Sequence, residues 1–189
     1  MREYDTILKF KVEGVLSHPL HVGGGIDDVD DILIHPVNGV PYKQATGMAG
    51  ALRSYAIDKG LETSYVFGGA DSIDDADSRL RVSDAFIEVN DTDAIALEYR
   101  PRVSIDDASG TVSEGVVSGT DRSSGHKFEM VYVGEGAKIG FDCYLYITKD
   151  RIDSSKKFML ELLSAVNDEL IQFGGQKSNG CGYIKPTWI

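Results

Sequence analysis

The sequence predicts an α+β domain in which an antiparallel sheet carries two helices on one face. Residues 6–16 alternate between apolar and polar side chains, which is the period of a half-buried strand. Residues 154–173 repeat apolar residues at helical spacing behind a serine that can cap a helix. Residues 127–133 and 138–148 have the composition of two strands, and the turn sequence GEGA joins them.

With the remaining elements the order is strand–helix–strand–insertion–strand–strand–helix–strand. Thr46 is a candidate cap for a helix over residues 47–59. Residues 81–89 alternate as a strand, and residues 183–186 form a short closing strand. This order predicts a ferredoxin-like (RRM-like) core, and the length is that of a single domain over residues 1–189.

Residues 91–126 are polar and rich in turn-forming residues, without a strong period. We expect them to form an insertion that leaves the core, as an irregular hairpin. A hairpin that carries basic side chains suits contact with nucleic acid, although such segments are also often plain surface loops. The basic residues in or beside it are Arg100, Arg102, Arg122, His126 and Lys127.

The composition narrows the compartment and the class of partner. The N-terminus has no signal-peptide core and no apolar run reaches the length of a membrane span, so we expect a cytoplasmic protein without a membrane partner. The two cysteines form no metal-type pair and no disulfide framework, which is typical of a reducing compartment. The net charge of -11 argues against a general binder of nucleic acid, whose surface is usually basic.

The stretch FGGQKSNGCG, residues 173–182, is a candidate phosphate-binding loop. Backbone N–H groups beside glycines cradle phosphate oxygens, and Lys177 and Ser178 add a charge and a hydroxyl. The alternative is a glycine-rich exit from the preceding helix, with no ligand. The order GxxxxGK[ST] that opens a helix in nucleotide-binding P-loops is absent.

The stretch PYKQATGMAGALRS, residues 41–54, places small residues at the start of a helix and Arg53 farther along it. A phosphate backbone can approach such a helix start closely. The alternative is an ordinary capped helix with a surface arginine.

A third candidate is the acidic stretch after the glycines at positions 23–25. Grouped carboxylates bind hard cations such as Mg²⁺, and a carboxylate can help to activate a hydroxyl. The alternative is a solvated charged loop, and the spacing is not that of an EF-hand. The carboxylates are Asp27, Asp28, Asp30 and Asp31, and His21 precedes them.

Five stretches in order carry a family resemblance. Residues 39–53 follow, without a gap, the pattern G-x-P-Y-I-P-G-S-S-L-K-G-A-L-R. Further likenesses are YVFGG at 65–69, SRLRVSDAFI at 78–87, RVSIDDASGTVSEG at 102–115 and GGQKSNGCGYI at 174–184. Together they resemble the RAMP superfamily, the repeat-associated proteins of CRISPR effector complexes, and most of all the backbone subunit of type III systems.

The chain departs from the family pattern at a few basic positions. Asp107 stands where the family usually has arginine, and Ala49 stands where it has lysine. These changes agree with the acidic total and fit a subunit that its neighbours hold in place.

The resemblance implies a subunit that stacks along a guide (CRISPR) RNA with further RAMP proteins and other effector-complex subunits. A protruding hairpin, the thumb, would wedge the duplex between the guide and a single-stranded target RNA. A loop aspartate, Asp30 by the gap-free count and Asp31 as second choice, would support target cleavage with Mg²⁺ or Mn²⁺ held by Asp30. The residues that the resemblance and the basic pattern assign to RNA binding are His21, Lys43, Thr46, Arg53, Arg100, Arg102, Arg122, Lys127, Gly174, Gly175, Lys177 and Ser178.

Three functions therefore remain open from the sequence. The first is a guide-directed endoribonuclease subunit of a type III complex in antiviral defence. The second is a RAMP subunit that holds or caps the guide filament without cutting. The third is an unrelated ferredoxin-like protein that acts through protein contacts.

Overall fold

The computed structural model describes residues 4–23, 34–69, 77–88, 97–103, 115–116, 122–123, 127–175 and 177–188. Its main body is a six-stranded sheet in which every strand pairing is antiparallel. The strands follow one another across the sheet in the order β10 (Ile184–Trp188), β1 (Thr6–Leu16), β9 (Lys138–Ile147), β4 (Ala85–Glu88) and β2 (Tyr42–Lys43). The short strand β3 (Leu80–Val82) also pairs with β9.

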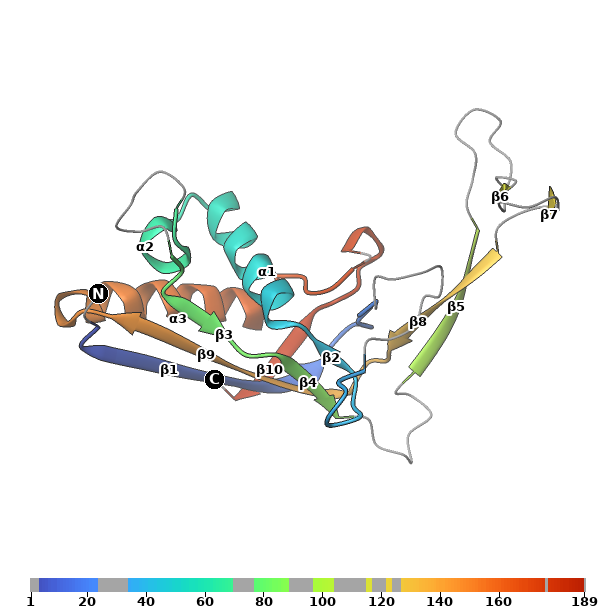
Figure 1. Cartoon of the computed structure of the whole chain (residues 1–189), viewed down its shortest axis with the longest axis horizontal. Coiled ribbons are helices and arrows are strands. Elements are labelled where there is room, and N and C mark those ends of the chain that lie inside the picture. Colours follow the sequence, from blue (N-terminus) through green and yellow to red (C-terminus); the bar gives the residue numbers. More distant parts are fainter. Residues whose placement is uncertain are drawn as a thin grey trace.

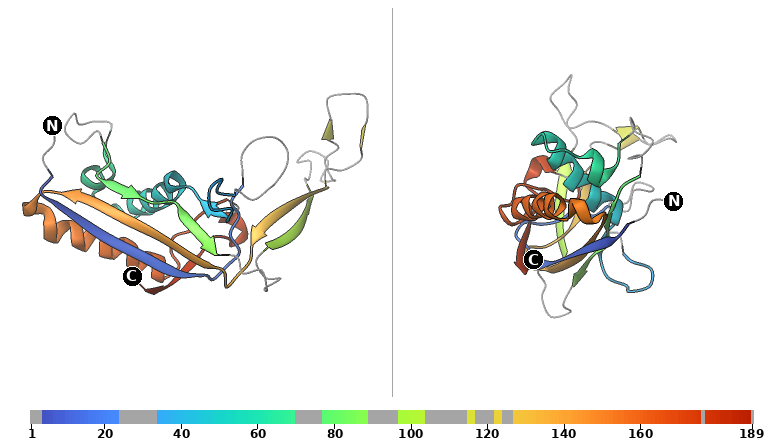
Figure 2. Two further views of the ribbon diagram at one scale, coloured as in Figure 1. Left: turned by 60° about the horizontal axis from the view of Figure 1, so that its bottom comes forward. Right: turned by 90° about the vertical axis from the view of Figure 1, so that its left-hand side faces the viewer.

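The helices cover one face of this sheet and leave the other face open (Figures 1 and 2). They are α1 (Ala45–Asp58), α2 (Ser64–Phe67) and α3 (Ile152–Asn167), with 3-10 turns at Lys149–Arg151 and Lys177–Asn179. The predicted antiparallel sheet with two long helices on one face is therefore confirmed. None of the helices in the described part of the chain has the length and apolar character needed to cross a membrane.

The alternation predicted for residues 6–16 is confirmed by the burial pattern of β1, and β9 alternates in the same way. In β9, Phe141, Cys143, Leu145 and Ile147 are all buried against the helices. Burial, and next the charge of Asp142, raises the pKa of the Cys143 thiol to about 12, so this cysteine packs as a neutral apolar side chain.

A two-stranded antiparallel sheet projects from this body (Figure 1). It pairs β5 (Leu97–Val103) with β8 (Lys127–Val133), and β6 (Gly115–Val116) pairs with β7 (Arg122–Ser123) farther along the chain. The base of β8 is joined to the body, because Val133 and Leu20 exchange two backbone hydrogen bonds of 2.9 Å.

The start of α1 differs from the expected serine/threonine type of cap. The helix begins at Ala45, and the N-cap residue Gln44 makes no side-chain capping hydrogen bond. The Ala45 N–H instead donates to Asp84 Oδ1 at 2.7 Å. The Asp84 carboxylate, at the junction between β3 and β4, therefore caps the helix. Thr46, the cap expected from the sequence, is an exposed residue of the first turn.

The end of α3 was predicted at residue 173 and lies at Asn167. Glu169 takes a left-handed φ of 56°, and the Leu170 N–H returns to the Ala165 carbonyl at 2.9 Å. This is a Schellman-type stop, which usually carries glycine at the left-handed position. Leu170, an apolar residue within the predicted helix range 154–173, therefore lies beyond the end of the helix and is 55% exposed.

The predicted strand over residues 81–89 is two strands. Between them, the Ser83 N–H donates to the Asp142 carbonyl at 2.8 Å, and the Ser83 hydroxyl accepts the Asp142 N–H at 2.9 Å. A side-chain oxygen replaces one bond of the ladder there, which frees Asp84 to turn toward α1.

Candidate nucleic-acid interface

A short segment before the acidic stretch ties together three parts of the fold. The His21 carbonyl accepts the Gly175 N–H at 3.1 Å. His21 Nδ1 lies 3.2 Å from the Val131 carbonyl oxygen of β8, and its ring lies 5.3 Å from that of Tyr132. Partly buried His21 therefore stands where the glycine loop (residues 173–182) meets the base of the projecting strands.

The glycine loop is closed by its own hydrogen bonds. The Phe173 N–H donates to the Gly182 carbonyl at 2.7 Å, and the Gly182 N–H donates to the Pro19 carbonyl at 2.9 Å. The Gln172 amide donates to the carbonyls of Lys177 at 2.9 Å and Cys181 at 3.2 Å. The loop thus has a defined path, with Lys177 and Ser178 exposed on its turn.

Three of the four glycines in this loop are required by the chain's own packing. A Cβ at Gly174, where φ is 82°, would lie 2.5 Å from the His21 carbonyl oxygen. A Cβ at Gly175 would lie 2.9 Å from the His21 ring, and one at Gly182 would overlap the Phe173 carbonyl. A role of Gly174 and Gly175 in binding phosphate stays a prediction, since the loop already has an internal reason for both.

Lys43 and Lys177 bring two positive charges together beside the start of α1. The Lys43 side chain lies over the first turn of the helix, where a Cβ at Gly47 would be 2.6 Å from its Cε. Burial lowers the pKa of the Lys43 ammonium, and the charge of Lys177 lowers it further. Within the described part of the chain, no carboxylate forms an ion pair with Lys43. An anion here would relieve the repulsion, and the positive end of the helix dipole favours one as well.

An exposed stripe continues this site along α1. Thr46, Gly50 and Arg53 are spaced to share one face of the helix, and all three are exposed. A Cβ at Gly50 would have no heavy atom of the described residues within 4 Å. Glycine in a helix interior costs about 1 kcal/mol relative to alanine, so the described part of the chain gives no reason for this residue.

The other predicted RNA-binding residues lie on the projecting strands. Arg100 pairs with Met130, and Arg102 pairs with Phe128, across β5 and β8. Arg122 lies on β7, and Lys127 begins β8. Arg100, Arg102 and Lys127 thus lie on the sheet whose base is fixed beside His21, and Arg122 lies on the separate pair β6–β7.

The predicted catalytic and metal-binding aspartates, Asp30 and Asp31, lie outside the described residues. The chain reaches them from Gly23, beside the His21 ring, and leaves them at Ile34, which pairs with Pro41 just before β2. Both ends of this stretch are therefore anchored next to Lys43 and His21. The described residues contain no group of three or more His, Cys, Asp or Glu that could hold a metal ion.

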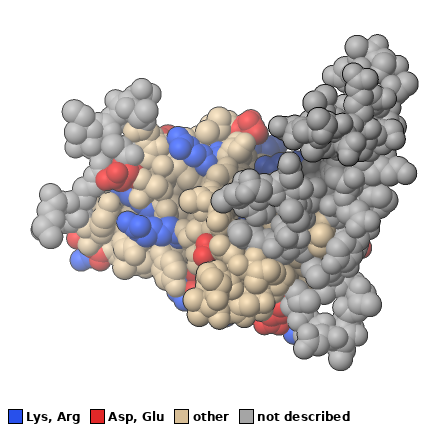
Figure 3. All heavy atoms as spheres, turned by 45° about the vertical axis from the view of Figure 1, so that its right-hand side comes forward, with Lys and Arg blue, Asp and Glu red and all other residues tan. Residues whose placement is uncertain are grey.

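The charge distribution agrees with the acidic composition. On the face shown in Figure 3, Lys and Arg side chains of the described residues stand in separate groups, with Asp and Glu side chains among them. No continuous basic surface of described residues covers this face.

Sequence reasoning missed two residues that shape this interface. Asp84 accepts a hydrogen bond from the N–H of Ala45, the first residue of α1. The Gln172 side chain donates a hydrogen bond across the glycine loop to the Lys177 carbonyl. Asp84 belongs to the stretch SRLRVSDAFI, so its motif was visible although its partner, 39 positions away, was not.

Comparisons with known proteins agree with this architecture. The model of the RAMP superfamily matches residues 15–185. A chain of the solved structure "Cryo-EM structure of the Type III-B Cmr-beta bound to cognate target RNA" superposes with a TM-score of 0.65 at 15% sequence identity. The superposition covers 95% of this chain and 58% of that one, so the protein spans less than two thirds of that chain's length. A search of curated protein sequences finds no significant match.

Proposed function

Because the chain belongs to the RAMP superfamily, we propose that it is a backbone subunit of a type III CRISPR ribonucleoprotein complex. In this proposal it binds a guide RNA on a ferredoxin-like core and cleaves complementary target RNA at regular intervals. Its partners are the guide RNA, a single-stranded target RNA and other effector subunits, further RAMP proteins among them.

The observation that carries the proposal is the convergence of Lys43 and Lys177 beside the start of α1. Within the described residues no carboxylate pairs with Lys43, which is partly buried and feels the charge of Lys177, so an anion bound here would be stabilised. A guide phosphate supplies this negative charge. The exposed stripe of Thr46, Gly50 and Arg53 then lets the next stretch of RNA backbone lie close to the helix.

This arrangement reads RNA backbone and not bases. Lysine ammonium groups and a helix start contact phosphate without regard to sequence. Base pairing by the guide supplies the specificity, so an acidic subunit with few local contacts is sufficient when neighbouring subunits hold the same RNA.

Cleavage is assigned to the acidic stretch, with Asp30 as the metal ligand and Asp31 as the second candidate. A divalent Mg²⁺ or Mn²⁺ ion there supplies charge neutralisation at the scissile phosphate. The described residues hold no group of three or more His, Cys, Asp or Glu that could bind a metal ion, and the acidic stretch is the part of the chain to which the proposal assigns the ligands. Residues of the chain contribute mainly position, because attack by a 2′-OH on its own phosphate depends on in-line geometry.

Guide binding is tested with the reconstituted complex carrying Lys177→Gln, and with Lys157→Gln on the exposed face of α3 as the matched control. Removal of one phosphate contact should lower the slope of log K against log salt by about 0.7, as expected for single-stranded RNA. An unchanged slope in Lys177→Gln, or an equal change in the control, would contradict the assignment of the Lys43–Lys177 site.

Cleavage is tested separately with labelled complementary RNA, using Asp30→Asn, Asp31→Asn and, as control, Asp28→Asn. We expect regularly spaced products from the wild type and the control, and none from Asp30→Asn, while target binding persists. Products that survive both Asp30→Asn and Asp31→Asn would leave a non-catalytic subunit that holds or caps the guide filament.

A further inference from the structure

The open face of the sheet carries tyrosine rings that the RNA site beside α1 does not use. They lie where β1 begins and β9 ends, at the end of the sheet away from β5 and β8 (Figures 1 and 2). The alternation of β9 sends Tyr144 and Tyr146 to the open face, since the residues on either side of them are buried against the helices. The tyrosine stripe, as we call this surface, consists of Tyr4, Ile7, Lys9, Arg81, Tyr144 and Tyr146.

Three strands bring these side chains onto one surface. Ile7 of β1 stands opposite Tyr146, and it is 54% exposed. Tyr144 stands between Lys9 of β1 and Arg81 of β3. Tyr144 and Tyr146 are two residues apart on one strand, so their positions are separated by about 7 Å. Two partly exposed rings at this separation can each receive one of two neighbouring bases of an extended single strand.

The charge left unpaired on the stripe is positive. Its one carboxylate neighbour, Asp142, is 25% exposed, and its Oδ2 accepts the Tyr144 hydroxyl at 2.9 Å and lies 3.3 Å from Lys9 Nζ. The other oxygen, Oδ1, is buried, so this carboxylate presents little charge to an approaching anion. Among the described residues no carboxylate pairs with Arg81, whose Cζ lies 6.0 Å from the centre of the Tyr146 ring.

A row of rings with a free cation beside it matches the chemistry of a single-stranded nucleic acid. Bases stack on aromatic side chains, and an arginine or lysine between the rings contacts the phosphates that join them. An acidic protein segment would also meet the cations, but it carries no flat groups to fill the spacing of the rings. In a chain with a net charge of -11, a surface with this local balance is complementary to a polyanion.

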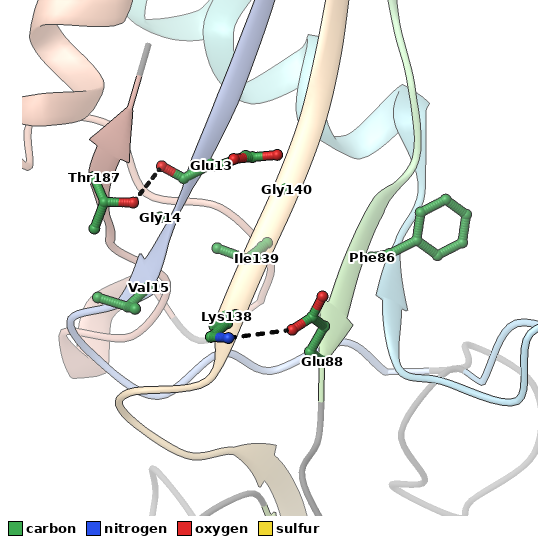
Figure 4. A pocket seen from close by; sticks show the side chains of 9 residues that line it. All are labelled: Glu13, Gly14, Val15, Phe86, Glu88, Lys138, Ile139, Gly140 and Thr187. Atoms are coloured by element: carbon green, nitrogen blue, oxygen red, sulfur yellow. Dashed lines mark hydrogen bonds and ion pairs between the residues drawn. The ribbon is translucent and has the colours of Figure 1, made fainter.

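The other end of the same face has the opposite character (Figure 4). Glu13 and Glu88 stand there, and the ring of Phe86 points away from them. Lys11 pairs with Glu13, and Lys138 Nζ lies 3.7 Å from Glu88 Oε2. The described residues at this end therefore present paired charges and no stacking ring, which limits the expected contact to the tyrosine stripe.

We propose that the tyrosine stripe binds two consecutive unpaired bases of a single-stranded RNA by stacking, with Arg81 on the adjoining phosphate. The contact is independent of sequence, because every base has a π-face. The choice of RNA rests on the proposed function, in which a single-stranded target RNA enters the complex. The surface is separate from the Lys43–Lys177 site, so its binding can be measured apart from that of the guide.

The test titrates the ¹⁵N-labelled full chain with decaadenylate and follows the backbone amides of Tyr144 and Tyr146. The control is a decamer of abasic tetrahydrofuran units, which has the same phosphates and offers nothing to stack. We expect saturable shifts at both amides with decaadenylate, and binding at least about tenfold weaker with the abasic decamer, which is the loss of stacking for one or two bases. The Lys177 amide reports on the guide site in the same spectra.

Variants separate stacking from a general effect of charge. Tyr144→Leu and Tyr146→Leu should each weaken decaadenylate at the stripe about tenfold, whereas Tyr146→Phe keeps the ring and should keep the binding. Arg81→Gln should lower the slope of log K against log salt by about 0.7. Lys138→Gln, on the same face of the sheet, is the matched control and should leave that slope unchanged. Circular dichroism checks that each variant is folded.

The outcomes distinguish this proposal from the proposed function. No saturable shift at Tyr144 and Tyr146, equal binding of the abasic decamer, or binding that survives both leucine variants would each overturn the stripe. Shifts at Lys177 alone would overturn it as well and leave the guide site standing, whereas shifts at the stripe without Lys177 would support it and count against the guide site. Decaglutamate that displaces the RNA at equal concentration would assign the face to an acidic protein partner, and tighter binding of decadeoxyadenylate would overturn the choice of RNA.

Discussion

The glycines of the loop at residues 173–182 differ from Gly50 of α1 and Gly140 of β9 in whether the fold requires them. Gly174, Gly175 and Gly182 are blocked by the chain itself, by His21 or by the Phe173 backbone. Gly50 and Gly140 face open space or ordinary contacts, and neither has a positive φ. The cluster that stands out in the sequence therefore has a structural explanation, whereas the isolated glycines do not.

This difference bears on how a binding surface is recognised. A glycine that the fold needs is expected whatever the protein binds, since replacing it would distort the backbone. A glycine that the fold does not need lowers the stability of the folded chain without improving its packing. The close approach of a partner is then a physical reason for glycine at that position. By this argument α1 and the open face of the sheet are stronger candidates for contact than the glycine loop.

The largest expected effect is at Gly182. Alanine there would have to hold a φ of 89° and would also overlap the Phe173 carbonyl. We expect Gly182→Ala to lower the free energy of unfolding by about 3–5 kcal/mol, from left-handed strain and overpacking together. Urea unfolding followed by circular dichroism measures it.

The matched control is Gly180→Ala, where φ is 72° but a Cβ would meet no heavy atom of the described residues within 4 Å. Only the left-handed cost of about 1–2 kcal/mol should appear. Equal losses in the two variants would show that the contact with Phe173 does not matter.

The next effect compares Gly14 with Gly140, which lie on the neighbouring strands β1 and β9. A Cβ at Gly14 would overlap the Lys185 carbonyl and lie 2.8 Å from Pro186 Cα, so β10 would have to move. We expect Gly14→Ala to cost about 1–3 kcal/mol. Gly140→Ala should be neutral or stabilising by up to about 1 kcal/mol. A loss of stability in Gly140→Ala would show that the chain does need this glycine.

The sequence predicted what depends on local periodicity. Alternation in β1 and β9 follows directly from one buried and one open face, so both strands were visible. The start of α1 could not be predicted from local sequence, because the Asp84 carboxylate that caps it comes from a distant turn. The end of α3 could not be predicted either, because Glu169 occupies a left-handed position that usually carries glycine.

The candidate site shows the same division. Lys43 and Lys177 were each predicted from their own motif, as a helix-start lysine and a loop lysine. Their approach to each other depends on the fold that ties the glycine loop to His21, which no local pattern encodes. The roles of Asp30 and Asp31 stay predictions from the family resemblance.

A smaller effect of opposite sign is expected at Gly50. Gly50→Ala should stabilise α1 by about 1 kcal/mol, which raises the melting temperature by about 2–4 °C in a chain of this size. Gly50→Leu should keep the fold and weaken guide retention in the reconstituted complex, because its side chain occupies the exposed stripe. The melting temperature serves as the control for folding. Full guide retention by the leucine variant would remove α1 from the RNA interface.

The smallest and most specific effect is that of pH on Lys43. Because burial and then Lys177 lower its pKa in the folded chain, the folded state binds fewer protons than the unfolded state between that lowered pKa and the usual 10.5. Charged Lys43 thus destabilises the fold at neutral pH, and the penalty is relieved as the pH rises through the lowered pKa.

Lys43→Met keeps the stem over Gly47 and removes the charge, so it should raise the free energy of unfolding at pH 7 by more than at pH 10.5. Urea unfolding of wild type and variant at both pH values measures the difference. Lys177→Met is the matched control, because its exposed side chain removes the same repulsion without any change in burial at Lys43. It should recover only part of the gain. A stability difference that does not change with pH would mean that the charge of Lys43 is fully solvated, and the argument for an anion beside α1 would lose its main support.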